Sequence, residues 1–66
     1  MRLLVNGHPH ELAPELTLAE LLEQLTATTR GSAAAVDGAV VPRGQWPTLR
    51  LHEGQSVEIL TAVQGG

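Results

Sequence analysis

The chain has 66 residues, of which 42% are hydrophobic, and a formal net charge of −3, values that predict one small, folded domain. It contains no cysteine, which excludes disulfides, thiolate metal sites and a cysteine nucleophile, and its scattered arginines give no electrostatic footprint for nucleic acid. Because no apolar run is long enough to span a membrane and no signal-peptide pattern is present, we expect a cytoplasmic protein that binds neither nucleic acid nor membrane.

A β-hairpin is predicted at the start of the chain. Residues 1–5 form an apolar run that leads into Asn6-Gly7, a dipeptide that tolerates the positive φ angles of a type I′ turn. A two-residue loop sets a register in which Arg2 faces Glu11, a favourable pair of opposite charges. Pro9 cannot donate a ladder hydrogen bond, so we expect the second strand to lie at the edge of the sheet or to be broken there.

One amphipathic helix is predicted next, and it begins at a capping box. Thr17 and Glu20 have the spacing at which the hydroxyl accepts from the Glu20 N–H while the carboxylate reaches back. Leu16 before the cap fits a hydrophobic staple with a leucine of the next turn. The buried face of this helix is predicted to consist of four leucines: Leu18, Leu21, Leu22 and Leu25.

A short second hairpin follows. Residues 33–36 and 39–41 flank Asp37-Gly38, which repeats the type I′ signal, and Pro42 ends the returning strand. The stretch after it is irregular, except that leucines alternate with an arginine over residues 49–51 and suggest a brief strand.

Trp46, in this irregular stretch, is predicted to plug a satellite of the core, with its indole N–H bonded to a carbonyl. Residues 57–63 are apolar on nearly both faces, which is typical of a central strand, and we expect this strand to pair beside the first. The order of elements predicts an α+β fold in which one main helix packs across a small mixed sheet. We divide the chain into a domain at 1–63 and a flexible di-glycine tail at 64–66.

The tail offers the chemistry of a single carboxyl group. Gly65 and Gly66 have no Cβ, so they can lie extended in a slot that is too narrow for other residues. A carboxylate is a poor electrophile, but once it is joined to a leaving group such as a phosphate it can be attacked by sulfur or nitrogen. We therefore hypothesise that Gly66 is a covalent loading point; a frayed terminus is the competing interpretation.

Several stretches carry a family resemblance: the Asn6-Gly7 turn, the helix start at 17–22, the element at 36–43 with Trp46, and the closing stretches 53–59 and 63–66. Together they resemble the β-grasp, ubiquitin-like sulfur carriers, and among these the ThiS family of thiamin biosynthesis. The resemblance spans the whole chain. The terminal di-glycine is common to all such carriers, whereas Val41-Pro42-Arg43 with Trp46 resembles the ThiS family in particular.

The resemblance implies a cycle at Gly66. An E1-like adenylyltransferase of the ThiF type transfers AMP from ATP to the Gly66 carboxylate. A persulfide donor, such as a cysteine desulfurase, then leaves a thiocarboxylate, and a thiazole synthase of the ThiG type accepts the sulfur. The tail residues Gly65, Gln64 and Val63 are implied to bind these partners. ATP is used by the activating enzyme, so the chain itself needs no cofactor, has no catalytic residue and is not an enzyme.

Other functions remain open on the sequence alone. The same chemistry could serve another acceptor, as in the small subunit of molybdopterin synthase, or the domain could be an interaction module whose di-glycine is never activated. Arg43 could dock an acidic patch of a partner or be ordinary surface charge. Leu60, Ala62 and Val63 could form an exposed apolar patch for partners or belong to the core.

Three histidines are the remaining candidates for a site. His8 and His10 have the H-x-H spacing of a zinc-binding pair, and His52 is the third histidine. Without cysteine or clustered acids beside them, we expect solvated histidines at a sheet edge and no metal site.

Overall fold

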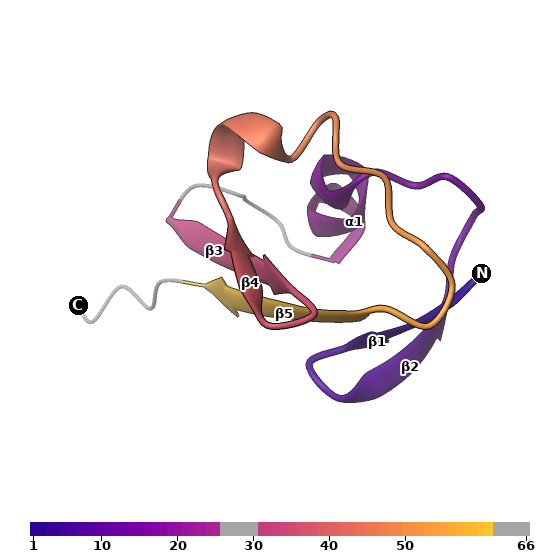
Figure 1. The fold of residues 1–66 in the computed structure, drawn as a ribbon. Helices are drawn as coiled ribbons and strands as arrows, with labels where there is room; N and C mark the ends of the chain where they lie inside the picture. The colour runs from indigo at the N-terminus through magenta and orange to yellow at the C-terminus, as the bar shows by residue number, and fades with distance from the viewer. Residues whose placement is uncertain (26–30, 62–66) are drawn as a thin grey trace.

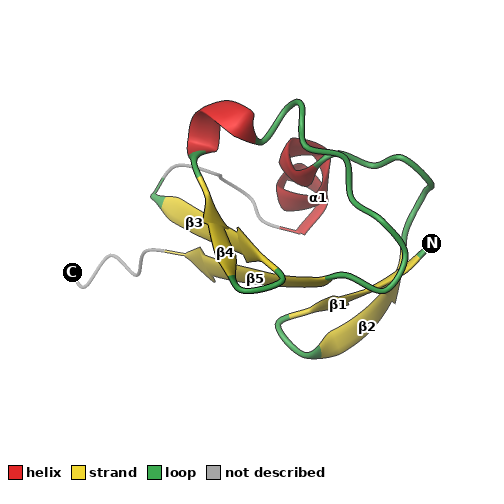
Figure 2. Ribbon diagram, in the orientation of Figure 1, coloured by secondary structure: helices red, strands yellow, loops and turns green. Residues whose placement is uncertain are grey.

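The computed structural model describes residues 1–25 and 31–61. These residues form a five-stranded mixed sheet with one helix across one of its faces (Figures 1 and 2). The elements, in chain order, are β1 (Arg2–Val5), β2 (His8–Glu11), α1 (Leu18–Leu25), β3 (Ser32–Val36), β4 (Ala39–Val41), the 3₁₀ turn η1 (Arg43–Gln45) and β5 (Ser56–Thr61). The strands lie in the order β2-β1-β5-β3-β4, with β5 parallel to β1 and antiparallel to β3. The predicted α+β architecture and the central place of the last strand are confirmed.

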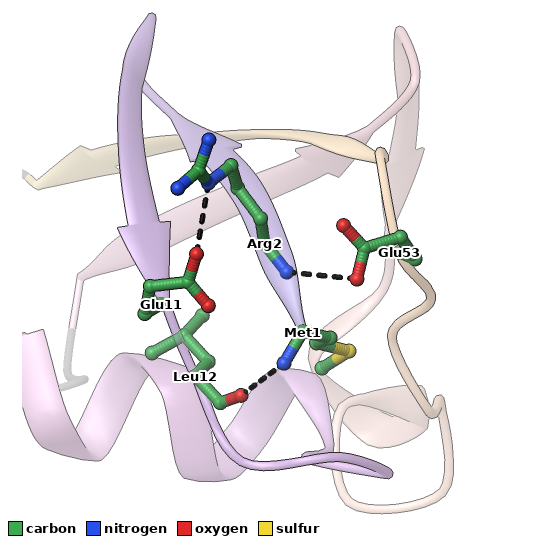
Figure 3. A network of polar contacts seen from close by, with 5 residues as sticks. All are labelled: Met1, Arg2, Glu11, Leu12 and Glu53. Carbon is green, nitrogen blue, oxygen red and sulfur yellow. Dashed lines mark hydrogen bonds and ion pairs between the residues drawn. The ribbon is translucent and has the colours of Figure 1, made fainter.

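The first hairpin has the predicted register and turn. Asn6 and Gly7 adopt φ angles of 50° and 83°, as a type I′ turn requires. Arg2 pairs with Glu11, and its Nε donates to a Glu11 carboxylate oxygen at 2.8 Å (Figure 3). The main-chain N–H of Arg2 donates to Glu53, which ties the loop before β5 to the start of β1 (Figure 3). β2, which contains Pro9, lies at the sheet edge, as predicted.

The capping box at the start of α1 is formed as predicted. The Thr17 hydroxyl accepts from the Glu20 N–H at 3.2 Å, and the Glu20 carboxylate accepts from the Thr17 main-chain N–H at 2.9 Å and from its hydroxyl at 3.1 Å. These two donors hold the pKa of Glu20 below its usual value of 4.5, and the main-chain N–H of Thr17 has a larger effect than its hydroxyl.

We expect Glu20→Gln to reveal this carboxylate in the pH dependence of stability. A depressed pKa in the folded state stabilises the fold above the pKa of the unfolded chain, and this contribution is lost as the pH falls through the folded pKa. Gln keeps the capping geometry but has no charge. The stability advantage of the parent chain over the variant should therefore shrink between about pH 5 and about pH 2. Urea titrations followed by Trp46 fluorescence measure it, and a pH-independent difference would contradict the assignment.

The segment from Trp46 to Leu51 covers the start of the helix. The N–H groups of Leu18 and Ala19, which have no partner inside the helix, donate to the carbonyls of Leu49 and Trp46. The prediction of a brief strand at 49–51 is wrong, because the main chain there is bonded to the helix start and makes only an isolated bridge between Thr17 and Arg50.

The core lies between α1 and the facing side of the sheet. Its completely buried side chains come from the helix, the sheet and the covering segment: Leu3, Leu18, Leu21, Leu22, Leu51 and Val57. Trp46 is 4% exposed and belongs to this same cluster, so the prediction of a separate satellite is wrong; its indole N–H does bond a carbonyl, that of Val41, at 2.9 Å.

Leu25 departs from the predicted buried face. It is 39% exposed, although its angular position on the helix matches that of the three buried leucines. Leu25 is the last residue of α1, so its exposure follows from its place at the helix end and not from the side of the helix on which it lies. No helix among the described residues is long and apolar enough to cross a membrane.

Candidate functional site

The candidate site is the end of β5 and the residues that continue from it. β5 lies in the middle of the sheet (Figure 1), where it pairs with β1 at Ser56 and Val57 and with β3 as far as Thr61. Of the predicted site residues, Arg43 and Leu60 are described. The others lie outside the described residues: Ala62, Val63, Gln64, Gly65 and Gly66. The division of the chain between residues 63 and 64 therefore stays a prediction.

Side chains from the two hairpin turns hold β5 at two points. Asp37, in the turn between β3 and β4, accepts from the Ser56 N–H at 2.9 Å. Asn6, in the turn between β1 and β2, accepts from the Ile59 N–H at 2.8 Å and donates to the Ile59 carbonyl at 3.2 Å. The sequence predicts only a turn role for both residues. Nothing in the local pattern shows that the two turns flank the same distant strand.

Near the end of β5, the sheet face opposite the helix is largely apolar, and no described residue covers it. Leu60 is 72% exposed there, and Val40 of β4 is 77% exposed. Alternating residues of β3, which lies between their strands, complete a shallow hollow on this face. We call this surface the open sheet face and define it by Ala33, Ala35, Val40, Glu58 and Leu60.

Arg43 lies at the start of η1, on the element that carries the specific part of the family resemblance. Its guanidinium carbon is 4.9 Å from the centroid of the Trp46 ring, the distance of a cation–π contact. The guanidinium therefore covers the indole, and packing on Trp46 is a structural role for this side chain.

Two of the three histidines share a strand and the third does not. His8 and His10 lie on β2, while His52 lies in the loop before β5. The described residues contain no group of three or more histidine, aspartate or glutamate side chains that could hold a metal ion. The chemical group that the sequence singled out, the Gly66 carboxylate, lies outside the described residues.

Comparisons with known proteins agree with one another. A model of the ThiS family matches residues 3–66. The chain is 33% identical to the sulfur carrier protein ThiS of Escherichia coli, and the match covers both chains completely. It is also 26% identical to a thiazole synthase of Paramagnetospirillum magneticum, in a match that covers all of this chain and 20% of that protein. A crystal structure of the thiamine biosynthesis protein ThiS from Geobacter metallireducens, 32% identical, superposes with a TM-score of 0.85 over both complete chains. A solution structure of a thiamine biosynthesis protein from that organism gives 0.84, over this whole chain and 88% of that one. The predicted β-grasp fold is confirmed.

Proposed function

The chain belongs to the ThiS family and is a sulfur carrier of thiamin biosynthesis, and from this premise we propose that the Gly66 carboxylate is the group that carries the sulfur. The observation that supports this most directly is the reach of the similarity. The family model extends to residue 66, and the Escherichia coli carrier is covered over its full length, so the di-glycine lies within the matched region. The chain is in this proposal a substrate of other proteins and not an enzyme.

Three chemical steps charge the tail. An E1-like adenylyltransferase of the ThiF type transfers AMP from ATP to a Gly66 oxygen and releases pyrophosphate, which makes the carbonyl carbon an electrophile with a good leaving group. The terminal sulfur of a persulfide, supplied by a donor such as a cysteine desulfurase, then attacks that carbon and displaces AMP. Reductive cleavage of the resulting S–S bond by a thiol leaves the thiocarboxylate, whose sulfur is a softer nucleophile than a carboxylate oxygen.

A thiazole synthase of the ThiG type is the proposed acceptor. The chain is similar to one fifth of a thiazole synthase, which indicates that this thiazole synthase contains a segment like this chain. Joining a carrier to its acceptor raises their effective concentration, which is useful when the two act on each other. We propose that the reactions take place in the cytoplasm. We also propose that Val63, Gln64 and Gly65 form the tail segment that enters the partners' active sites.

Reconstitution tests the function as a whole. The chain is incubated with ATP, its adenylyltransferase, a persulfide donor and thiazole synthase, and both the intact mass and the thiazole product are followed. We expect AMP addition, then replacement of one oxygen by sulfur, then thiazole formation. An unchanged mass beside an active adenylyltransferase would show a passive interaction module, and charging without thiazole would show a different acceptor.

The open sheet face is the proposed docking surface for the adenylyltransferase. Apart from Glu58 it is apolar, and it includes Leu60 of β5, two residues before Ala62. Exposed apolar patches next to a functional group commonly mark protein contacts. The net charge of −3 favours a partner whose surface around this contact is basic.

Leu60→Gln should weaken this docking without weakening the fold. Because Leu60 is already largely exposed, we expect stability to change by less than about 0.5 kcal/mol. The kcat/KM of adenylation should fall by about tenfold, which corresponds to about 1.4 kcal/mol of binding free energy. Leu25→Gln is the matched control, since it makes the same chemical change on the helix, and it should leave kcat/KM unchanged. Equal effects of the two variants would disprove docking through this face.

A further inference from the structure

The hydrogen bonds between β1 and β5 form a regular series, and the side chain of Asn6 makes the last bonds of this series. The Leu4 N–H donates to the Gln55 carbonyl at 3.0 Å, and the Asn6 N–H donates to the Val57 carbonyl at 2.9 Å. These acceptors are two residues apart, as in a parallel ladder. The next position in the series is Ile59, and there both main-chain groups are bonded by the Asn6 side-chain amide.

This amide takes the place of a strand that has ended. β1 stops at Val5 and its chain turns away at Asn6-Gly7, whereas β5 continues to Thr61 (Figure 1). On the β1 side, the Asn6 amide is therefore the last described partner of β5 before the tail. Its Oδ1 and Nδ2 reproduce the acceptor and donor that a continuing strand would present.

We propose that Asn6 is a positioning residue for the charging of the tail: by bonding Ile59, it fixes the direction in which β5 delivers the residues that follow. The inference rests on the proposed function. The tail must bring one carboxylate oxygen to a reacting phosphate inside another protein, and four residues lie between Thr61 and Gly66. β3 pairs with the other side of β5 as far as Thr61, so without the Asn6 bonds the end of β5 would be held on one side only. The looser strand end would spread the positions of that oxygen and lower the fraction of complexes in a reactive geometry.

Asp37 provides a matched control for Asn6. It also begins a type I′ turn, with φ at 50°, and it also bonds the main chain of β5, but at Ser56, the end of the strand remote from the tail. Glycine at either position keeps the turn, because glycine accepts positive φ, and removes the side-chain bonds. Asn6→Gly and Asp37→Gly should therefore destabilise the fold alike, while only the first affects the tail.

Steady-state adenylation of the full-length chain tests the proposal, with pyrophosphate release measured at varied carrier concentration and Trp46 fluorescence used to choose a temperature at which all chains are folded. For Asn6→Gly we expect kcat to fall by about tenfold with KM within about twofold, since docking is kept and positioning is lost. Asp37→Gly should keep both constants within about twofold. Hydrogen exchange should show faster exchange of the Ile59 amide in the first variant and of the Ser56 amide in the second.

The outcomes separate the proposal from the function on which it rests. A parent chain that is not adenylated contradicts the proposed function. A parent chain that is adenylated, together with an unchanged kcat for Asn6→Gly or an equal loss for Asp37→Gly, overturns the role of Asn6 alone. Should Asn6→Gly fail to fold, Asn6→Asp keeps the acceptor for the Ile59 N–H and replaces the donor with a carboxylate oxygen that faces the Ile59 carbonyl. Its kcat should fall by about threefold, and a parental kcat would then overturn the proposal.

Discussion

A chain that ends at Gly65 is expected to fold normally and to accept no AMP. The described core uses side chains up to Ile59, so we expect the domain to fold without Gly66. The shortened chain still ends in a glycine carboxylate, but that group stops about 3.5 Å short of the reacting phosphate. Since a displacement of about 1 Å at a reacting centre can cost about a hundredfold in rate, adenylation should fall below detection.

Intact mass spectrometry after incubation with ATP and the adenylyltransferase measures this loss, and thermal unfolding followed by Trp46 fluorescence measures the fold. A chain extended by one residue after Gly66 is the matched control for length, and it should fail for the opposite reason. Adenylation of the truncated chain at the parental rate would show that Gly66 is not the loading point.

The substitution Leu22→Ala should leave most molecules unfolded. Leu22 is completely buried in α1 against the sheet, and replacing a buried leucine with alanine costs about 2–5 kcal/mol. A single core in so short a chain supplies only about 3–5 kcal/mol in total, so the loss is comparable with the whole stability. The variant should lack a cooperative urea transition at 37 °C, a temperature chosen as roughly physiological, and charge poorly because few molecules are folded.

Leu25→Ala distinguishes loss of the core from loss of any helical leucine. The side chain is partly exposed at the end of the same helix, so we expect a cost of less than about 1 kcal/mol and normal charging. Equal destabilisation by the two substitutions would contradict the placement of the core, and it would mean that the helix end is packed more tightly than the structure shows.

Features set by short stretches of sequence were predictable. The dipeptides Asn6-Gly7 and Asp37-Gly38 require positive φ angles and located both hairpins, and the spacing of Thr17 and Glu20 located the start of the helix. Pro9 located an edge strand, because a proline in a strand interior leaves one ladder bond unmade. Each of these inferences needs only residues within one turn or one strand.

Features set by distant neighbours were not predictable in this way. Residues 49–51 alternate as a strand does, but the Leu49 carbonyl accepts from the Leu18 N–H and the Leu51 N–H donates to the Leu16 carbonyl. Leu25 has the periodicity of a core residue, and its exposure depends on where the helix ends relative to the sheet. The bonds from Asn6 and Asp37 to β5 depend on a sheet order that no local pattern encodes.

Within the candidate site, the sequence predicts that Gly66 is the reactive group, and the structure describes the strand that precedes the tail. The di-glycine pointed to Gly66 through the chemistry of a bare carboxylate. The arrangement behind it, a central strand held by two turns beside an open apolar face, follows from the topology. For Arg43, the contact with Trp46 supplies a packing role alongside the docking role that the sequence suggested.

The position of the sulfur atom in the charged chain tests the central claim most directly. The chain is charged with ATP, the adenylyltransferase and a persulfide donor, and is then fragmented in a mass spectrometer so that each residue is weighed in turn. The account predicts that the C-terminal fragments alone gain sulfur in place of one oxygen, at Gly66. Thiazole formation from a chain whose Gly66 carries no sulfur would contradict it.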